Sequence, residues 1–358
     1  MIKTLIALGA TLTLGAAGGW LFNLWQMPLA WMIGAMCVTT VAALLGAPLK
    51  GSKRLRNMMI PVLGIMLGSA FTPEALQDAH LWLPSMVTMI IYVVFVATCV
   101  GFFLYRIVGV GVVTAYFSAT PGGLATMVVL GHDMGGDERA IALTHSVRVL
   151  LTVLIIPFWF RIFAGYEPGG LATLGTISDL PFRDAGLLLL CGVVGFFGGR
   201  AIKLPSAQLL GPMLLSAGIH LGGITEAKPP MEVINIAQIV IGSGIGARFA
   251  GINLRLVLKV MTAAIASTFF MVGLAAVIGM ILEHLTGLPF QAVWLAFAPG
   301  GLAEMALISL AMGIDPAFVS THHLLRVSFM VVMAPIVFKY LKKRFAIDGD
   351  TPKSSSSG

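Results

Sequence analysis

Charge is scarce in this sequence. Only 10% of its 358 residues are Asp, Glu, Lys or Arg, whereas about 25% is usual for soluble globular domains. Apolar residues make up 58% of the chain, and the mean hydropathy is +0.96. A water-soluble domain could not bury this much apolar surface, because even large domains leave much of their surface exposed. The composition excludes an ordinary soluble domain and indicates a protein that lies in a lipid bilayer.

Cysteine and clustered histidine are also lacking. The three cysteines, Cys37, Cys99 and Cys191, lie within apolar stretches at spacings that suggest neither disulfides nor a metal site. The seven histidines show no metal-ligand spacing, and a copper oxygenase would need clustered histidine ligands. We therefore expect no cofactor, no metal and no enzymatic activity.

Long hydrophilic segments are lacking as well. The longest predicted loop is Arg161–Asp184, and the chain ends in a short tail with a serine run, Ser354–Ser357, typical of disorder. The net charge of +7 comes mainly from basic residues at the edges of apolar stretches. We therefore expect no direct nucleic-acid binding. The expected partners are the lipid bilayer and an unknown small solute or ion, and a homo-oligomer is left open.

Apolar stretches of about 20 residues, the length of a membrane-spanning helix, recur along the chain. Several are short or interrupted. They predict an all-α integral membrane protein with about 10–12 transmembrane segments. The candidate spans are Ile2–Phe22, Leu29–Ala47, Met58–Phe71, Leu81–Tyr105, Val108–Leu130, Ala140–Phe160, Ala185–Ile202, Ala207–Leu221, Val233–Phe249, Leu256–Leu282, Ala292–Met312 and Ala317–Tyr340.

The chain also contains an internal repeat. The segment Pro-Gly-Gly-Leu-Ala-Thr-Met at Pro121–Met127 returns as Pro-Gly-Gly-Leu-Ala-Glu-Met at Pro299–Met305, 178 positions later. Many other residues recur at nearly the same offset, which indicates a duplication. We therefore divide the chain into a first membrane repeat (1–160), a linker loop (161–184), a second membrane repeat (185–340) and a disordered cytoplasmic tail (341–358).

The basic residues favour inverted repeats. If each copy crosses the membrane five times and its Pro-Gly-Gly segment is re-entrant, sixteen Lys and Arg residues face one side and three face the other. If every segment crosses fully, the repeats are parallel and the counts are thirteen and six. Cytoplasmic loops carry an excess of Lys and Arg. The inverted arrangement is therefore favoured, with both termini on the cytoplasmic side.

The two Pro-Gly-Gly segments should break their helices. Proline removes a backbone donor and clashes with the preceding turn, and each glycine costs about 1 kcal/mol in a helix interior. Matched breaks in two repeats point to a transport site, because freed backbone groups can bind ions or polar solutes. The alternative is a structural kink. The candidate binding residues here are Pro121, Gly122, Gly123, Thr126, Pro299, Gly300, Gly301 and Glu304.

Glu304 and two His-x-x-Arg pairs are the polar candidates. Glu304 stands where the first copy has Thr126, and a carboxylate at this depth is costly unless paired or hydrated. We expect it to bind a proton or cation, or to cap the second half-helix. His145 and Arg148, like their counterparts His323 and Arg326, lie three apart on one helix face. Each arginine either binds an anion or bridges the backbone ends of the neighbouring broken helix.

The two Pro-Gly-Gly-Leu-Ala-x-Met segments and the downstream His-x-x-Arg pairs resemble the AbrB-type family of bacterial membrane proteins, which arose by tandem duplication. The resemblance covers nearly the whole chain and implies a multi-pass protein of the bacterial inner membrane. Members carry labels such as membrane regulator of gene expression and ammonia monooxygenase. The organisation is also similar to that of cation/proton antiporters and bile-acid-type symporters, which use crossing broken helices. Those antiporters often carry paired acidic residues there, whereas only Glu304 is near here.

From these features we expect a secondary transporter or exporter that moves a small solute or ion by alternating access around the two broken helices. The alternative is a membrane-embedded sensor that affects gene expression indirectly. Ammonia monooxygenase activity is not expected, because the histidines are scattered.

Overall fold

The computed structural model describes residues 2–73, 77, 79–165, 174–204, 206–251 and 254–345. Within these ranges all regular elements are helices and no strand occurs, which confirms the predicted all-α class. The predicted tail from residue 346 onward and linker residues 166–173 lie outside the described residues.

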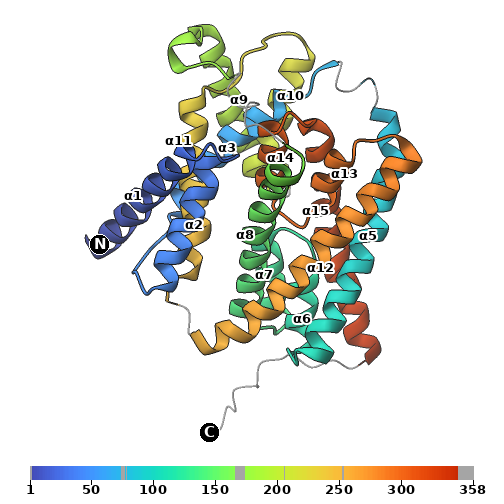
Figure 1. The fold of residues 1–358 in the computed structure, drawn as a ribbon. Helices are drawn as coiled ribbons and strands as arrows, with labels where there is room; N and C mark the ends of the chain where they lie inside the picture. Colours follow the sequence, from blue (N-terminus) through green and yellow to red (C-terminus); the bar gives the residue numbers. More distant parts are fainter. Residues whose placement is uncertain are drawn as a thin grey trace.

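The helices of the two copies follow one another in the same order along the chain (Figure 1). Those of the first copy are α1 (Ile2–Leu24), α2 (Ala30–Leu44), α3 (Lys53–Gly68), η1 (Ala79–Trp82), α5 (Leu83–Phe102), η2 (Phe103–Ile107), α6 (Val112–Ala119), α7 (Leu124–Asp133) and α8 (Glu138–Phe163). Those that follow are η3 (Ile177–Asp179), α9 (Phe182–Ala201), α10 (Ala207–Leu221), α11 (Met231–Gly246), η4 (Ala247–Phe249), α12 (Leu254–Thr286), α13 (Phe290–Phe297), α14 (Leu302–Ala311) and α15 (Pro316–Phe345).

Six of the described helices are long and apolar enough to cross a membrane: α1, α5 with its flanking turns, α8, α9, α12 and α15. Large apolar side chains point outward from them, such as Ile91 on α5, Leu189 on α9 and Met280 on α12. Lipid is the solvent that suits such a surface. The chain is therefore a multi-pass membrane protein.

Some predicted boundaries need correction. Helix α15 continues to Phe345, so the tail cannot begin at residue 341. Its last turn contains Lys342, Lys343 and Arg344, and basic side chains stabilise a helix C-terminus. In the predicted linker loop, α8 extends to Phe163 and α9 already starts at Phe182.

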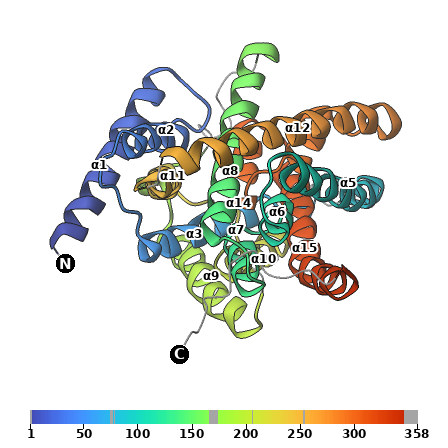
Figure 2. The ribbon, with the colours of Figure 1, turned by 90° about the horizontal axis from the view of Figure 1, so that it is seen from below.

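The helices form two bundles (Figure 2). The first three helices of each copy pack together as α1, α2, α3, α9, α10 and α11, here called the scaffold bundle. The remaining helices of each copy, α5–α8 and α12–α15, form the core bundle. Figure 2 shows α8, α14 and α7 near the middle, between α1, α2 and α11 on one side and α5, α12 and α15 on the other. Both broken helices belong to the core bundle.

The two copies run in opposite directions. At one end of the molecule a single cavity is lined by Trp82 before α5, Phe160 near the end of α8, Leu288 after α12 and Phe318 near the start of α15. The start of α5 therefore meets the end of its counterpart α12, and the end of α8 meets the start of its counterpart α15 (Figure 1). The predicted inverted arrangement is confirmed.

Glycines at matched positions let the copies interleave. A Cβ on Gly64 of α3 would lie 2.5 Å from the carbonyl oxygen of Leu209 on α10. A Cβ on Gly242 of α11 would lie 2.4 Å from the carbonyl oxygen of Met32 on α2. Both distances are too short for any side chain. Small residues that allow such backbone approach are typical of helix contacts in lipid. Contacts between copies thus help to hold the scaffold bundle together.

Candidate functional site

Both Pro-Gly-Gly segments break their helices as predicted. Helix α6 ends at Ala119 and α7 begins at Leu124, while α13 ends at Phe297 and α14 begins at Leu302. The backbone between the half-helices is extended at both edges of each break. In the first break ψ is 119° at Thr120 and 127° at Gly123, and in the second ψ is 139° at Ala298 and 152° at Gly301. Each break is therefore a short extended segment between two half-helices.

The half-helices form re-entrant hairpins. In the first copy the backbone N–H of Asp137, after α7, donates to Thr114 Oγ1 near the start of α6, at 2.8 Å. In the second copy Pro289, before α13, lines the same cavity as Asp315, after α14. Each hairpin therefore enters and leaves at one end of the molecule. Because the copies are inverted, the two hairpins approach the centre from opposite ends.

The two glycines of each motif have different roles. A Cβ on Gly122 would lie 2.8 Å from Met127 Cε, and a Cβ on Gly300 would lie 2.6 Å from Met305 Cε. The first glycine therefore makes room for the methionine that ends the motif. The second glycine, Gly123 in the first copy, is the N-cap of the following half-helix and has no side chain to cap it. The first N–H groups of that half-helix thus lack a side-chain acceptor at the cap.

The two histidines anchor the half-helices. His145 Nε2 donates to the carbonyl of Phe117 at 2.9 Å, and His323 Nε2 donates to that of Leu295 at 3.0 Å. Both side chains are fully buried. The acceptors, like the donors, are related by the repeat. Each histidine satisfies a carbonyl in the last turn of a short half-helix, where intrahelical partners are missing.

The two arginines, by contrast, are not equivalent. Arg326 donates from Nη1 to the Ala298 carbonyl at 2.5 Å and from Nη2 to the Gly300 carbonyl at 2.6 Å. Arg148 donates from Nη2 to His145 Nδ1 at 2.8 Å, and its Nε and Nη1 have no hydrogen-bond partner. Their side chains are 3% and 4% exposed. Arg326 bridges the second break as one hypothesis proposed, whereas Arg148 does not bridge the first.

The two buried guanidinium groups lie within electrostatic range of one another. Their positive charges repel each other, and Tyr92 of α5 is within electrostatic range of both. Tyr92 is buried, donates to the Met271 carbonyl at 3.0 Å and contacts the ring of Phe297 beside the second break. Sequence reasoning did not single out Tyr92, because it belongs to no repeated motif.

Glu304 lies in the first turn of α14, beside the second break. Its half-buried carboxylate folds back over Gly301, where a Cβ would collide with it. It interacts electrostatically with Arg248 of η4, so it is partly compensated by a cation of the scaffold bundle. Its counterpart Thr126 lies beside Gly123 in the first copy. An acidic group is favourable at a helix N-terminus, as one of the two hypotheses for Glu304 expected.

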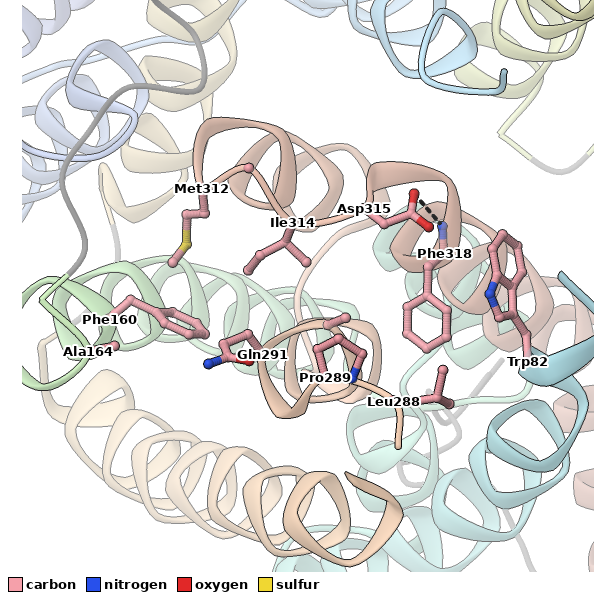
Figure 3. Close-up of a pocket in the computed structure, with 12 residues that line it drawn as sticks. Trp82, Phe160, Ala164, Leu288, Pro289, Gln291, Met312, Ile314, Asp315 and Phe318 are labelled. Atoms are coloured by element: carbon pink, nitrogen blue, oxygen red, sulfur yellow. Dashed lines mark hydrogen bonds between the residues drawn. The ribbon is translucent and has the colours of Figure 1, made fainter. Parts of the chain in front are cut away.

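A cavity of about 510 Å³ opens where α13 and α15 begin (Figure 3). Asp315 on its wall caps α15, accepting from the backbone N–H groups of Ala317 at 2.8 Å and Phe318 at 3.3 Å. Burial raises the pKa of Asp315. The ring of Phe318 packs on His322, with centroids 4.1 Å apart, and His322 also bonds Ser85 Oγ at 2.8 Å.

His322 contacts the cavity residue Phe318 and lies one helical turn before Arg326 on α15. His322 and its neighbour His323 have different partners, because successive residues of a helix point in different directions. Among the described residues there is no group of His, Cys, Asp and Glu side chains suited to a metal ion.

Comparison with known proteins gives three matches. The family model described as Transition state regulatory protein AbrB matches residues 31–342. An uncharacterized protein of Bacillus subtilis (strain 168), YhjN, is 28% identical over 374 residues, which span 97% of this chain and 96% of that protein. A protein of Escherichia coli (strain K12) named putative regulator AbrB is 25% identical over 318 residues, 88% of this chain and 91% of its own length.

Proposed function

This chain belongs to the AbrB family, and we propose that it is a secondary transporter that moves a small solute or ion by alternating access around its two broken helices. One observation carries the proposal: two re-entrant broken helices lie at matched positions of two inverted repeats, and each is hydrogen-bonded to a buried histidine of the helix that follows it, one turn before a buried arginine. Interrupted helices at corresponding places in two halves are typical of transporter binding sites.

The two ends of the core bundle differ in a way that suits one state of an alternating-access cycle. At the α13–α15 end, Ala292 lines the open cavity. At the opposite end its counterpart is Thr114, whose hydroxyl binds the backbone of Asp137 at 2.8 Å. This bond ties the first hairpin to the start of α8, and alanine cannot make it. Inverted repeats allow each half to adopt in turn the conformation of the other, which would exchange the open and closed ends.

We further propose that the protein lies in the bacterial inner membrane with both termini in the cytoplasm. The family match and the two bacterial relatives support the membrane, and the asymmetry of Lys and Arg supports the orientation. In this arrangement the cavity opens toward the outside.

The second candidate function is an indirect regulator of gene expression, which the printed name of the Escherichia coli relative favours. The same central site would then sense a solute instead of moving it. In both cases the chain is proposed to be neither an enzyme nor a nucleic-acid-binding protein.

Proteoliposomes that contain the purified chain test the proposal. Solute-induced currents or tracer uptake are measured with pools of small metabolites and ions under an imposed proton or sodium gradient. We expect saturable flux in the wild type and loss of gradient coupling in Glu304→Gln, with Thr126→Val as the matched change in the first copy. Saturable binding of a solute without flux in any gradient would contradict the transporter function and favour the sensor function.

A further inference from the structure

One carbonyl of the first break accepts a local backbone hydrogen bond, whereas its counterpart in the second break accepts from an arginine. In the first break the Gly122 N–H donates to the Thr120 carbonyl at 2.9 Å. In the second break the matched carbonyl, that of Ala298, accepts from Arg326 instead. The identical His-x-x-Arg pattern therefore has different tasks in the two copies. Arg326 belongs to the architecture of the second hairpin, and Arg148 is not needed for that of the first.

The guanidinium of Arg148 is left with unused donors. Its Nε and Nη1 carry three N–H groups, and none of them has a partner although the side chain is 96% buried. A buried charge without compensation is strongly unfavourable. An unsatisfied buried group of this kind calls for a partner that completes it, such as a bound ion.

No carboxylate of the described residues compensates this charge. The one ion pair among them joins the exposed side chains of His132 and Glu138. Glu304 interacts with Arg248, while the charge that acts on Arg148 is that of Arg326, and the nearby phenol of Tyr92 is neutral. The centre of the core bundle therefore carries two neighbouring positive charges and lacks a negative one.

The surroundings of Arg148 favour an anion further. Helix α7 packs on α8, which carries Arg148, and α7 begins at Leu124 with Gly123 as an N-cap that has no side chain. Uncapped N–H groups at a helix start attract anions. Two further arginines lie within electrostatic range in succession: Arg248 acts on His145, and the exposed Arg56 acts on Arg248. These arginines form a positively charged approach that would concentrate anions near the site.

From this arrangement we infer that the transported solute is a small oxyanion, a carboxylate included, bound by the free guanidinium donors of Arg148 beside Arg326. That the anion is transported rests on the proposed function. That it binds rests only on the geometry around Arg148. Guanidinium groups match the paired oxygens of carboxylate, phosphate and sulfate. Arg148, its hydrogen-bond partner His145 and the nearby Tyr92 are all buried, which favours a small ligand.

Thermal unfolding of the purified chain, followed by tryptophan fluorescence, tests this binding without transport. The probes are sodium phosphate, sulfate, acetate and succinate, each compared with sodium chloride and ammonium chloride at equal ionic strength. We expect at least one oxyanion to raise the unfolding midpoint saturably beyond chloride. In Arg148→Gln the concentration for half-maximal effect should rise at least tenfold, and Arg148→Lys should be intermediate. The control is Arg200→Gln, which removes an exposed arginine of α9 and should leave the response unchanged.

The inference is overturned if no oxyanion exceeds chloride in the wild type, or if Arg148→Gln retains the full response. Should Arg148→Gln fail to fold, the wild-type comparison of oxyanions with chloride still decides whether the site exists, and Arg148→Lys decides which residue forms it. Oxyanion binding without flux would contradict the transport function and support the oxyanion site. Flux of a cation or neutral solute without oxyanion binding would support the transport function and contradict the oxyanion site.

Discussion

His145 and Arg148 are joined by a hydrogen bond of 2.8 Å from Nη2 of the arginine to Nδ1 of the histidine. The other ring nitrogen of His145 donates to the carbonyl of Phe117 at the end of α6. The imidazole is therefore the neutral tautomer with its proton on Nε2, and it ties the guanidinium to the first half-helix. Movement of that half-helix would move the donors of Arg148 with it.

Replacing His145 should loosen this connection. His145→Ala leaves the buried Phe117 carbonyl without its donor, which costs about 1–3 kcal/mol. We expect a lower unfolding midpoint and weaker oxyanion binding from the same variant. His323→Ala, which breaks the matched bond to Leu295, should destabilise similarly without a direct effect on Arg148. Equal loss of anion binding in both variants would contradict the specific role of His145.

The two arginines should respond oppositely to neutralisation when no anion is bound. Arg326→Gln removes the donors to Ala298 and Gly300, and leaving buried carbonyls unpaired costs about 1–3 kcal/mol each. Arg148→Gln removes an uncompensated charge, so stability should be unchanged or higher. Denaturation in buffers without oxyanions measures both. A larger loss for Arg148→Gln than for Arg326→Gln would show that Arg148 is architectural.

The interleaved glycines predict a position-specific effect on one helix. Gly242→Ala places a methyl group against the Met32 carbonyl of α2, and such overpacking costs about 1–3 kcal/mol. Gly244→Ala, on the same helix, meets nothing within 4 Å and should gain up to about 1 kcal/mol from helix propensity. Unfolding midpoints of the two variants give the comparison. Similar midpoints would mean that the close approach does not matter.

Protonation of Asp315 should favour entry of an anion through the cavity. Burial raises the pKa of this carboxyl, so it becomes neutral at a higher pH than an exposed aspartate, whose pKa is about 3.9. The other side chains that line the cavity carry no charge. As pH falls through the raised pKa, repulsion is lost and the KM for outside anion should decrease. Asp315→Asn should give the low KM at all pH values; an unchanged pH profile in that variant would exclude Asp315.

Single cysteines would report which face each hairpin opens on. With Cys37, Cys99 and Cys191 replaced, Asp133→Cys at the end of α7 and Gln291→Cys at the start of α13 should react with an impermeant maleimide from opposite sides of the membrane. Both parent side chains are exposed, so labelling needs no structural change. Labelling of both from one side would contradict the inverted arrangement.

Much of the fold follows from sequence because duplication makes patterns comparable. The Pro-Gly-Gly breaks could be predicted from backbone chemistry alone, and the excess of basic residues selected the inverted arrangement that the structure has. The unequal roles of Arg148 and Arg326 could not be predicted, since both follow the same His-x-x-Arg pattern. They depend on whether Gly122 or an arginine satisfies the carbonyl at the break. Tyr92 was missed because its place beside both arginines arises only from tertiary packing.

The interleaving of the scaffold bundle has a consequence for biosynthesis. Because α3 packs on α10 and α2 packs on α11, neither copy completes its own helix contacts. During translation the face of α2 around Met32 and the face of α3 that carries Gly64 lack these partners in the bilayer until α10 and α11 have been inserted. A chain truncated after α8 would present those surfaces permanently, so the first copy should be a substrate for membrane proteolysis when it is made alone. Supplying the second copy as a separate polypeptide should protect it.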